Sequence, residues 1–439
     1  MIEWRNWTDD QVCRPAEIAR PHDAKGVTEI IDRATERGLS IRVAGSGHSF
    51  NGSVLTDGLL VTLENMNHVI DVDRDAGLVR VEAGITLRAL NEILADNGLA
   101  LENLGDIDHQ TIAGATSTGT HGTGGRFRNL SDALRSIEFV TADGSILEVD
   151  QESDADVWRA ARVGLGALGV VTAVTLRVVP AFTLRGVDDT APLDEVLEEI
   201  DDLVDTHEHF EFYNFPHSSL AITRTSDRVD GPPRPRSRPR AWLTDVLLNN
   251  HTLGSACRLG RRFPSRIPTI NRIASRIAGR HLRVDRSDRV FATVRRFRFT
   301  EMEYALPRAA AAAAVRGVRR VINEGPFHVP LPMEVRFVAA DDAFLSPATG
   351  RATCYVAVHM FEGMAWRAYF GAVEEIMREL GGRPHWGKRH FQSVESLRPL
   401  YPDWDRFADV RARLDPSGVF TNAYLERVLG PPAEPPAVN

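Results

Sequence analysis

A carboxylate and a guanidinium stand two positions apart in the stretch Met333-Glu334-Val335-Arg336-Phe337. Residues 331–338 alternate between apolar and other side chains, which predicts a strand. Because positions i and i+2 share one face of a strand, Glu334 and Arg336 project together while the apolar residues take the core face. Such a pair can clamp a polyol or a sugar through charge-assisted hydrogen bonds. A solvated, salt-bridged sheet face is the commoner origin of this spacing, so both interpretations stay open.

Two further polar residues are candidates for the same chemistry. His359 ends an alternating run over residues 354–360, where a histidine is more often structural than catalytic. Lys388 is one of only two lysines, with Lys25, among 52 basic residues. Lysine differs from arginine as a compact point charge that tolerates a crowded, partly buried position. Because the chain otherwise uses arginine, we expect Lys388 to be functional.

Two glycine-rich stretches suit a phosphorylated cofactor. The first spans residues 44–51 after a predicted strand over 39–43; its glycines allow a sharp turn and expose N–H groups that form an anion nest. His48 lies where this turn opens. The second spans residues 113–125 and has almost no side-chain bulk. No G-x-G-x-x-G triplet stands between a predicted strand and a predicted helix, so a Rossmann crevice is not expected.

Histidines in and near the second stretch have two interpretations. His109 and His121 are candidate ligands or bases, although His121 could equally hydrogen-bond within a packed glycine loop. The sequence contains no H-E-x-x-H or C-x-x-C spacing. We therefore expect no metal site.

Regular elements must position these residues. Helices are predicted over residues 23–38, 87–97 and 154–168, and strands over 59–63, 69–72, 78–83, 137–140, 146–149 and 170–179. These elements predict an α+β cofactor domain over residues 1–180. Helices over 193–207 and 364–380, with strands over 331–338 and 354–360, predict a second α+β domain over residues 181–405. Residues 406–439 form a compact, helix-rich end.

Composition limits the remaining classes of function. The chain of 439 residues is 43% hydrophobic and 26% charged, as in ordinary globular proteins, and its net charge of −8 gives no general attraction to nucleic acid. Cys13, Cys257 and Cys354 are scattered and odd in number, which favours free thiols in a reducing cytoplasm. No apolar signal segment and no run of roughly 18 apolar residues is present. A cytoplasmic protein is expected.

Residues 221–300 differ from this average, with 19 arginines, five aspartates and no glutamate. A helix here would carry Ile270, Ile273, Ala274, Ile277, Ala278 and Leu282 on one face. Arg272, Arg276, Arg280 and Arg283 would fall around its other side. We expect the apolar face to pack on the second domain, as short helices usually do. Weak peripheral contact with an anionic membrane is the alternative.

Together these motifs resemble those of the aldonolactone oxidoreductases, flavoproteins of the vanillyl-alcohol-oxidase type. Residues 45–50 resemble the family's flavin-attachment loop, and residues 103–106 with 120–124 its second FAD loop. Glu334-Val335-Arg336, His359 and residues 385–388 are similar to its substrate-side motifs, and residues 415–425 to its C-terminal signature. The resemblance covers nearly the whole chain and is strongest to the L-gulono-1,4-lactone dehydrogenases and oxidases.

The resemblance implies a fold and a cofactor. The fold is an FAD-binding domain of two α+β subdomains, followed by an α+β cap domain with an antiparallel sheet, and a C-terminus that returns to the FAD domain. FAD would be bonded covalently to His48 through its 8α-methyl group, or else be held tightly but dissociably. The residues implied to bind it are Gly45, Ser46, Gly47, His48, Ser49, Gly105, Asp106, Ala113, Gly114, Ser117, Thr118, Gly119, His121 and Gly122.

The resemblance also implies a reaction. Hydride would pass from a substrate C–H to flavin N5, which requires a base for the hydroxyl proton and positive charge for the reduced flavin. Lys388 would stand near the flavin or the developing oxyanion, and Arg336 would hold substrate oxygens. Glu334 and His359 would orient or deprotonate the substrate hydroxyl, and the sequence does not rank them.

The implied substrate is an aldono-1,4-lactone, such as L-gulono-1,4-lactone, oxidised at its C2 hydroxyl. An alditol oxidase is the alternative, but those enzymes have a serine where this chain has Asp106. A flavin-binding protein without catalysis is more remote, because it would have no use for Glu334, Arg336 and Lys388 together. Gly105 leaves room for oxygen at the flavin, whereas the similar dehydrogenases use another acceptor, such as a cytochrome or a dye. Both acceptors stay open.

Overall fold

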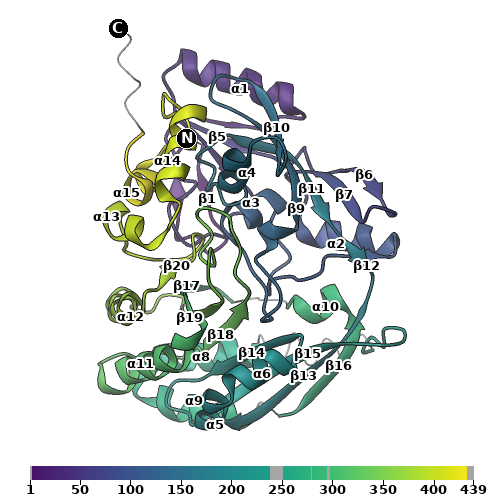
Figure 1. The fold of residues 1–439 in the computed structure, drawn as a ribbon. Coiled ribbons are helices and arrows are strands. Elements are labelled where there is room, and N and C mark those ends of the chain that lie inside the picture. The colour runs from purple at the N-terminus through teal and green to yellow at the C-terminus, as the bar shows by residue number, and fades with distance from the viewer. Residues whose placement is uncertain (1, 238–250, 278, 294–296, 433–439) are drawn as a thin grey trace.

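The computed structural model describes residues 2–237, 251–277, 279–293 and 297–432. Figure 1 shows the N-terminal elements at the top, with the yellow C-terminal helices beside them, and a large sheet in teal and green below. Among the described helices, none combines the length and the hydropathy needed to cross a bilayer. The three cysteines are free thiols, as expected from their spacing.

The N-terminal region contains a parallel three-stranded sheet of order β3-β5-β4. Its strands are β3 (Glu17–Ala19), β5 (Leu59–Thr62) and β4 (Ile41–Ala44). The predicted first helix is α1 (Ala24–Glu36), which begins after Asp23; the Asp23 carboxylate accepts a hydrogen bond from the Gly26 N–H. Its apolar positions, spaced three and four apart, pack on the sheet.

A five-stranded antiparallel sheet of order β10-β9-β11-β7-β6 completes this region. Its strands are β10 (Ile146–Asp150), β9 (Leu134–Val140), β11 (Val170–Arg177), β7 (Leu78–Glu82) and β6 (Val69–Asp73). The β9–β10 hairpin and α2 (Leu87–Asp96), which is capped by Thr86, lie where the sequence predicts them. α3 (Ile112–Ser117) starts the second glycine-rich stretch, and two short pairs join β1 (Trp4–Arg5) to β2 (Val12–Cys13) and β8 (Leu99–Ala100) to β12 (Val179–Pro180).

The lower sheet has the order β16-β13-β15-β14-β18-β19-β17-β20 and is antiparallel throughout. Its strands are β13 (Thr183–Pro192), β14 (His209–Asn214), β15 (Leu220–Val229), β16 (His281–Arg286), β17 (Phe299–Pro307), β18 (Met333–Val338), β19 (Thr353–Phe361) and β20 (Arg383–Pro384). Four helices cover its apolar face: α5 (Leu193–Glu198), α6 (Ile200–Thr206), α11 (Ala311–Glu324) and α12 (Arg367–Glu379). The other face is polar and contacts the N-terminal region.

The C-terminal segment packs against the N-terminal region. α14 (Trp404–Leu414) and α15 (Ala423–Leu429) place Trp404, Phe407 and Leu425 in one core with Leu90 of α2 and Leu176 of β11. The short α13 (Val394–Leu397) joins the same core. Residues 433–439 of this segment lie outside the described residues.

Four expected helices have different bounds. Over residues 154–168 only α4 (Ala155–Ala161) is helical, because Leu165 and Gly166 take positive φ values of 55° and 62° that turn the chain. The helix over 193–207 is divided at Glu199 into α5 and α6. The helix over 364–380 begins only at Arg367.

The amphipathic helix expected over residues 270–282 is α9 (Ile267–Ile277), and Leu282 lies instead on strand β16. Ala278 lies outside the described residues. The expectation that its apolar face packs on the second domain holds for Ile270 and Ala274, which are half-buried, but not for Ile273 and Ile277, which are 52% and 73% exposed.

Candidate functional site

The two glycine-rich stretches line one cavity of the N-terminal region. Residues of the first stretch follow directly from β4, and those of the second belong to α3 and its end. The predicted residues found on the cavity wall are Gly45, Ser46, Gly47, His48, Ser49, Ala113, Gly114, Ser117 and Thr118. Their small side chains leave backbone groups accessible to a ligand.

Packing within the chain itself requires some of these glycines. A Cβ on Gly45 would lie 2.3 Å from Thr111 Oγ1, and Gly47 has a positive φ of 67° beside Trp4. Gly45 therefore brings the first stretch against Thr111, whose hydroxyl also accepts from the Gly114 N–H at 3.3 Å. From the sequence, we expected these glycines because of the sharp turn alone. In the structure, the close approach of the two stretches also requires a residue without a side chain.

The remaining predicted cofactor residues lie away from this wall. Asp106 and Gly122 line a smaller cavity together with Arg336. A Cβ on Gly122 would lie 2.3 Å from the Leu104 carbonyl oxygen, and one on Gly105 3.0 Å from the His121 carbonyl oxygen. Gly119 has a φ of 72°. The second stretch thus folds tightly on itself and extends toward the lower sheet.

His48 lies between two aromatic rings. Its imidazole stacks on Trp7 at 5.6 Å and on His109 at 6.1 Å between ring centroids. Burial, and then the neighbouring His109, lower the pKa of His48 to about 4, so the ring is neutral at physiological pH. Its Nδ1 atom is buried and has no hydrogen-bond partner among the described residues. A neutral ring with an unused nitrogen is suited to bonding a cofactor.

The polar face of the lower sheet brings together residues from neighbouring strands. Arg336 Nε donates to Glu211 Oε2 at 2.8 Å, and the Arg336 guanidinium also pairs with Glu334 on the same strand. Tyr213 Oη lies 2.9 Å from both Glu211 Oε1 and Glu334 Oε1. Arg224 of β15 adds a contact of 3.1 Å to Glu211 Oε1. The spacing-based expectation of one shared face is therefore confirmed, and the face is buried rather than solvated.

Burial sets the ionisation of Glu334. It raises the pKa of this carboxyl above its ordinary value, and Glu211 raises it further, although Arg336 opposes both. Glu334 therefore holds a proton more readily than an ordinary glutamate.

Lys388 and His359 meet on a second carboxylate, Glu301 of β17. Lys388 Nζ donates to Glu301 Oε2 at 2.5 Å, and His359 Nε2 lies 3.6 Å from Glu301 Oε1. Burial raises the pKa of Glu301, but Lys388 and His359 outweigh it and lower the pKa to about 2. Burial lowers the pKa of His359, but the neighbouring Glu301 carboxylate outweighs burial and raises the pKa above its ordinary value. His359 Nδ1 donates to the Pro332 carbonyl oxygen at 2.8 Å, so both ring nitrogens are engaged.

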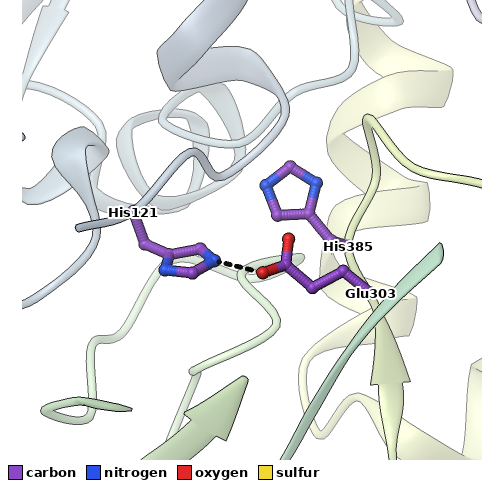
Figure 2. Close-up of side chains that lie close together, drawn as sticks. All are labelled: His121, Glu303 and His385. Carbon is purple, nitrogen blue, oxygen red and sulfur yellow. Dashed lines mark ion pairs between the residues drawn. The ribbon is translucent and has the colours of Figure 1, made fainter. Parts of the chain in front are cut away.

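His121 reaches the same sheet from the second glycine-rich stretch. Its Nε2 lies 3.2 Å from Glu303 Oε1, as the dashed line in Figure 2 shows. Its ring stacks on Tyr355 at 3.5 Å, and its Nδ1 donates to the Gly122 carbonyl oxygen at 2.8 Å. Burial raises the pKa of Glu303, but His121 outweighs it and lowers the pKa. This ion pair links the two regions of the molecule.

His385 completes this buried cluster, in which ligand atoms from all three residues lie within 4.8 Å of one another. His385 Nδ1 accepts from the Gly387 N–H at 3.0 Å, and burial lowers the pKa of His385 to about 3. A neutral imidazole that accepts at Nδ1 carries its hydrogen on Nε2 and has no lone pair there for a metal. His121 donates at Nδ1 to Gly122 and faces the Glu303 carboxylate with Nε2, so of the three residues Glu303 alone keeps a ligand atom, fewer than the three of a typical catalytic zinc site. The geometry favours a hydrogen-bonded cluster.

The first glycine-rich stretch is fixed to the loop that carries Lys388. The Phe50 N–H donates to the Gly387 carbonyl oxygen at 2.8 Å, and Asn51 Nδ2 donates to the Lys388 carbonyl oxygen at 2.9 Å. Lys388 Nζ lies 5.2 Å from the centroid of the Phe50 ring. Through these contacts, residues 340 positions apart in sequence, His48 and Lys388, are held on adjoining loops.

A third cavity connects to this polar face. It is bounded by Glu334 and His359 at the sheet and by apolar residues that include Phe297, Phe299, Leu331 and Ile277. The predicted substrate-side residues Glu334 and His359 thus share one cavity, while Lys388 reaches them through Glu301.

Several residues of the site were not expected from the sequence. Glu211, Glu301 and Glu303 each occupy an alternating stretch, and Glu301 and Glu303 show the same i, i+2 spacing as Glu334 and Arg336. Gly166 and Gly169 line the first cavity. They belong to the run Gly164-Leu165-Gly166-Ala167-Leu168-Gly169, whose triplet of glycines follows a helix and so escaped the Rossmann criterion.

The residues present fit an FAD cofactor. The lining of the first cavity is rich in glycine, serine and threonine, and it includes His48, whose Nδ1 atom has no hydrogen-bond partner among the described residues. These groups suit the phosphates and the ring system of a long cofactor.

Comparisons with known proteins agree with this geometry. Residues 15–150 match an FAD binding domain, and residues 174–428 match the D-arabinono-1,4-lactone oxidase family. The chain is 48% identical to L-gulono-1,4-lactone dehydrogenase of Mycobacterium tuberculosis, over 98% of this chain and 99% of that protein. It is 34% identical to L-gulonolactone oxidase of Bos taurus, over 98% of both chains. It is 32% identical to alditol oxidase of a Streptomyces species, over 97% and 98%.

Solved structures show the same fold. Cholesterol oxidase from B. sterolicum superposes with a TM-score of 0.79 at 16% identity, over 98% of this chain and 96% of that one. The fold is therefore the α+β fold of the vanillyl-alcohol-oxidase type, with an FAD-binding region and an antiparallel sheet, as expected. On the matches of its sequence, the chain belongs to the D-arabinono-1,4-lactone oxidase family of FAD-dependent oxidoreductases.

Proposed function

We propose that this protein oxidises the C2 hydroxyl of an aldono-1,4-lactone, such as L-gulono-1,4-lactone. The observation that carries the proposal is the buried polar face, on which Glu334, Arg336, His359 and the Lys388–Glu301 pair lie on neighbouring elements beside the FAD-binding region. The 48% identical relative is named for this lactone, and it matches nearly the whole chain. FAD, when bound, accepts the hydride from the substrate carbon.

Glu334 is the better candidate for the base. His359 already has both ring nitrogens engaged, and Glu301 raises its pKa, which favours the protonated form over a base. Burial raises the pKa of Glu334, which makes its carboxylate a stronger proton acceptor than an ordinary glutamate. Arg336 binds substrate oxygens and is held in place by Glu211. His359 orients the substrate hydroxyl, and Lys388 supplies a fixed positive charge, which Glu301 positions.

On the cofactor side, we propose covalent attachment of FAD at His48, supported by the unpartnered Nδ1 atom. The cofactor-binding residues are those on the cavity wall, with Gly105, Asp106, Gly119, His121 and Gly122 acting from the adjoining loop. The proposed division is 1–180 for the FAD domain, 181–405 for the cap and 406–439 for the returning segment. We place the protein in the cytoplasm.

The test is anaerobic mixing of the purified holoprotein with lactones and with alditols, followed by flavin absorbance. Bleaching by L-gulono-1,4-lactone at a rate well above that by xylitol or sorbitol is the expected result. Bleaching by alditols alone would establish the alditol oxidase alternative, which the 32% identical relative represents. No bleaching with any of them would leave a flavin-binding protein without catalysis. Oxygen uptake against cytochrome or dye reduction, with one lactone, then identifies the electron acceptor.

A further inference from the structure

One face of the lower region exposes large apolar side chains beside a group of arginines. It is formed by α8 (Leu253–Arg262), α9 and β16, and we refer to it as the basic apolar face. Its exposed apolar residues are Leu259, Phe263, Ile273, Ile277 and Leu282, which are 49–73% exposed. Only ten large apolar side chains are exposed anywhere in the described residues, so half of them gather on these elements.

The exposure results from how α9 packs. Its buried residues are Ile267, Asn271 and Ser275, at spacing i, i+4 and i+8. Asn271 Nδ2 donates to the Val329 carbonyl oxygen at 2.9 Å, and Ser275 shares a hydrogen bond of 2.8 Å with Ser218. Polar contacts thus fix the inner side of the helix, while the isoleucines at 273 and 277 turn outward. In a protein without a partner for this face, folding would be more favourable if the isoleucines were buried and the polar residues were exposed.

The charge of the face is predominantly positive, with Asp285 of β16 the one acidic residue in the sequence 251–286. Residues 251–284 contain eight arginines and no aspartate or glutamate. Within the part of the chain that the structure describes, no carboxylate pairs with the following six: Arg258, Arg261, Arg262, Arg266, Arg272 and Arg276. Elsewhere the arginines are mostly paired, as with Arg308 on Asp201 and Asp205. The missing counter-charges leave this face attractive to an anionic surface.

We propose that the basic apolar face docks on a lipid bilayer that contains anionic lipid. Side chains such as Ile273 and Leu259 would enter the headgroup boundary, and the flanking arginines would contact the lipid phosphates. Nucleic acid or an acidic protein would use the arginines but would gain little from five solvent-exposed apolar side chains, so a bilayer fits both features. The candidate substrate cavity is lined by Ile277 of the same face, and docking would turn that side of the cavity toward the membrane.

The test is co-sedimentation of the holoprotein with phosphatidylcholine vesicles that contain or lack phosphatidylglycerol, at low and at high salt. Binding to the anionic vesicles at low salt, reduced at high salt, is expected. Replacing Arg272 and Arg276 together by glutamine should weaken binding roughly 30-fold, since each basic residue near such a surface contributes about fivefold.

Apolar variants distinguish a bilayer from any other polyanion. The pair Leu259→Gln with Ile273→Gln should weaken vesicle binding roughly tenfold or more, because both side chains would lose their burial in lipid. The matched control is Ile70→Gln with Ile146→Gln, which removes isoleucines that are 52% and 47% exposed on β6 and β10 and should bind as the parent does.

The outcomes separate the docking surface from catalysis. Flavin bleaching by lactone in solution should be unchanged in the Leu259/Ile273 pair, so a loss of vesicle binding is not a loss of folding. Recovery of the parent in the supernatant under all four conditions overturns the proposal. Vesicle binding that the Leu259/Ile273 pair retains in full also overturns it, and points to an acidic macromolecule, which a heparin column would then confirm.

Discussion

The cofactor cavity and the polar face of the lower sheet use opposite kinds of residue. More than half of the residues on the cavity wall are glycine, alanine, serine or threonine. The polar face consists of charged side chains that are almost wholly buried, such as Glu301, Glu334 and Arg336. One region positions a ligand by shape and close approach, while the other positions charge.

This difference predicts which property a substitution changes first in each region, the stability or the activity. In the cavity, an added methyl group collides with the neighbouring chain, so stability should respond first. On the polar face, each charge is held by a partner, most often on another strand or loop, so the loss of one charge leaves its partner buried and unpaired. Activity should respond there before the fold does.

The largest effect is expected at Lys388. Lys388→Arg should lower turnover by about 10²–10³-fold. The bulky guanidinium cannot replace the compact ammonium, which lies 2.5 Å from Glu301 and next to the Phe50 ring. A misplaced preorganised charge costs about 3–4 kcal/mol of barrier. Single-turnover flavin bleaching measures it. Lys25→Arg, at the other lysine of the chain, exposed on α1, should leave the rate unchanged. Near-parental turnover of Lys388→Arg would contradict the shape argument.

A buried carboxyl group without a cationic partner in contact should have a different pKa, and so a different effect on stability, from the paired carboxylates. Paired Glu301 has its pKa lowered to about 2, whereas burial raises the pKa of Asp341 to about 6, against the single hydrogen bond from Ser346. The folded state therefore keeps a proton that the unfolded state releases between about pH 4 and pH 6. This group's contribution to stability accordingly falls as pH rises through that range, and above pH 6 the penalty is complete.

Removing that ionisation should stabilise the protein. Asp341→Asn should gain about 2–3 kcal/mol in the free energy of unfolding at pH 7.5 and nothing at pH 4. At pH 7.5 the variant no longer buries an ionised carboxylate, whereas at pH 4 the carboxyl group of the folded parent is still protonated, because its pKa is about 6. Urea unfolding at the two pH values measures the gain. An equal effect at both values would show that Asp341 does not titrate in this range.

The cofactor region was largely predictable from sequence because its signals are local. Glycines and hydroxyls lie within two short stretches, and caps such as Asp23 and Thr86 act within one turn of their helices. The pairing of Glu334 with Arg336 was predictable for the same reason, since i and i+2 lie on one face of a strand whatever surrounds it.

The partners of the polar face could not be predicted, because strand register determines them. Tyr213 meets Glu334 across 121 positions, and Glu301 meets Lys388 across 87. The orientation of α9 was mispredicted in part, for a related reason. Its apolar spacing was read correctly, but the side that packs is decided by Ser218 and the Val329 carbonyl, which lie far along the chain.

Steric fit in the cofactor region can be tested with two glycines of opposite expectation. Gly122→Ala should lose about 1–3 kcal/mol in the free energy of unfolding, because its Cβ would lie 2.3 Å from the Leu104 carbonyl oxygen. Gly371→Ala, in α12 with no atom within 4 Å of its added Cβ, should gain about 0.5–1 kcal/mol from helix propensity. Urea unfolding compares both with the parent. Equal stability of the two variants would remove the argument from close approach.

The smallest effect on turnover is expected at His48. A covalent bond to the cofactor would be lost there, but no hydrogen-bond partner of Nδ1 among the described residues would be left unsatisfied. Parent protein precipitated with acid should keep its yellow colour in the pellet, and His48→Ala should release it to the supernatant. The variant should fold and should turn over within about tenfold of the parent, through a lowered flavin potential worth about 1 kcal/mol. The matched control is His109→Ala, which removes the ring that stacks on His48 at 6.1 Å and should keep the colour in the pellet. Colour released entirely from the parent would mean that FAD is held without a covalent bond, and the shape of the cavity would then account for its retention.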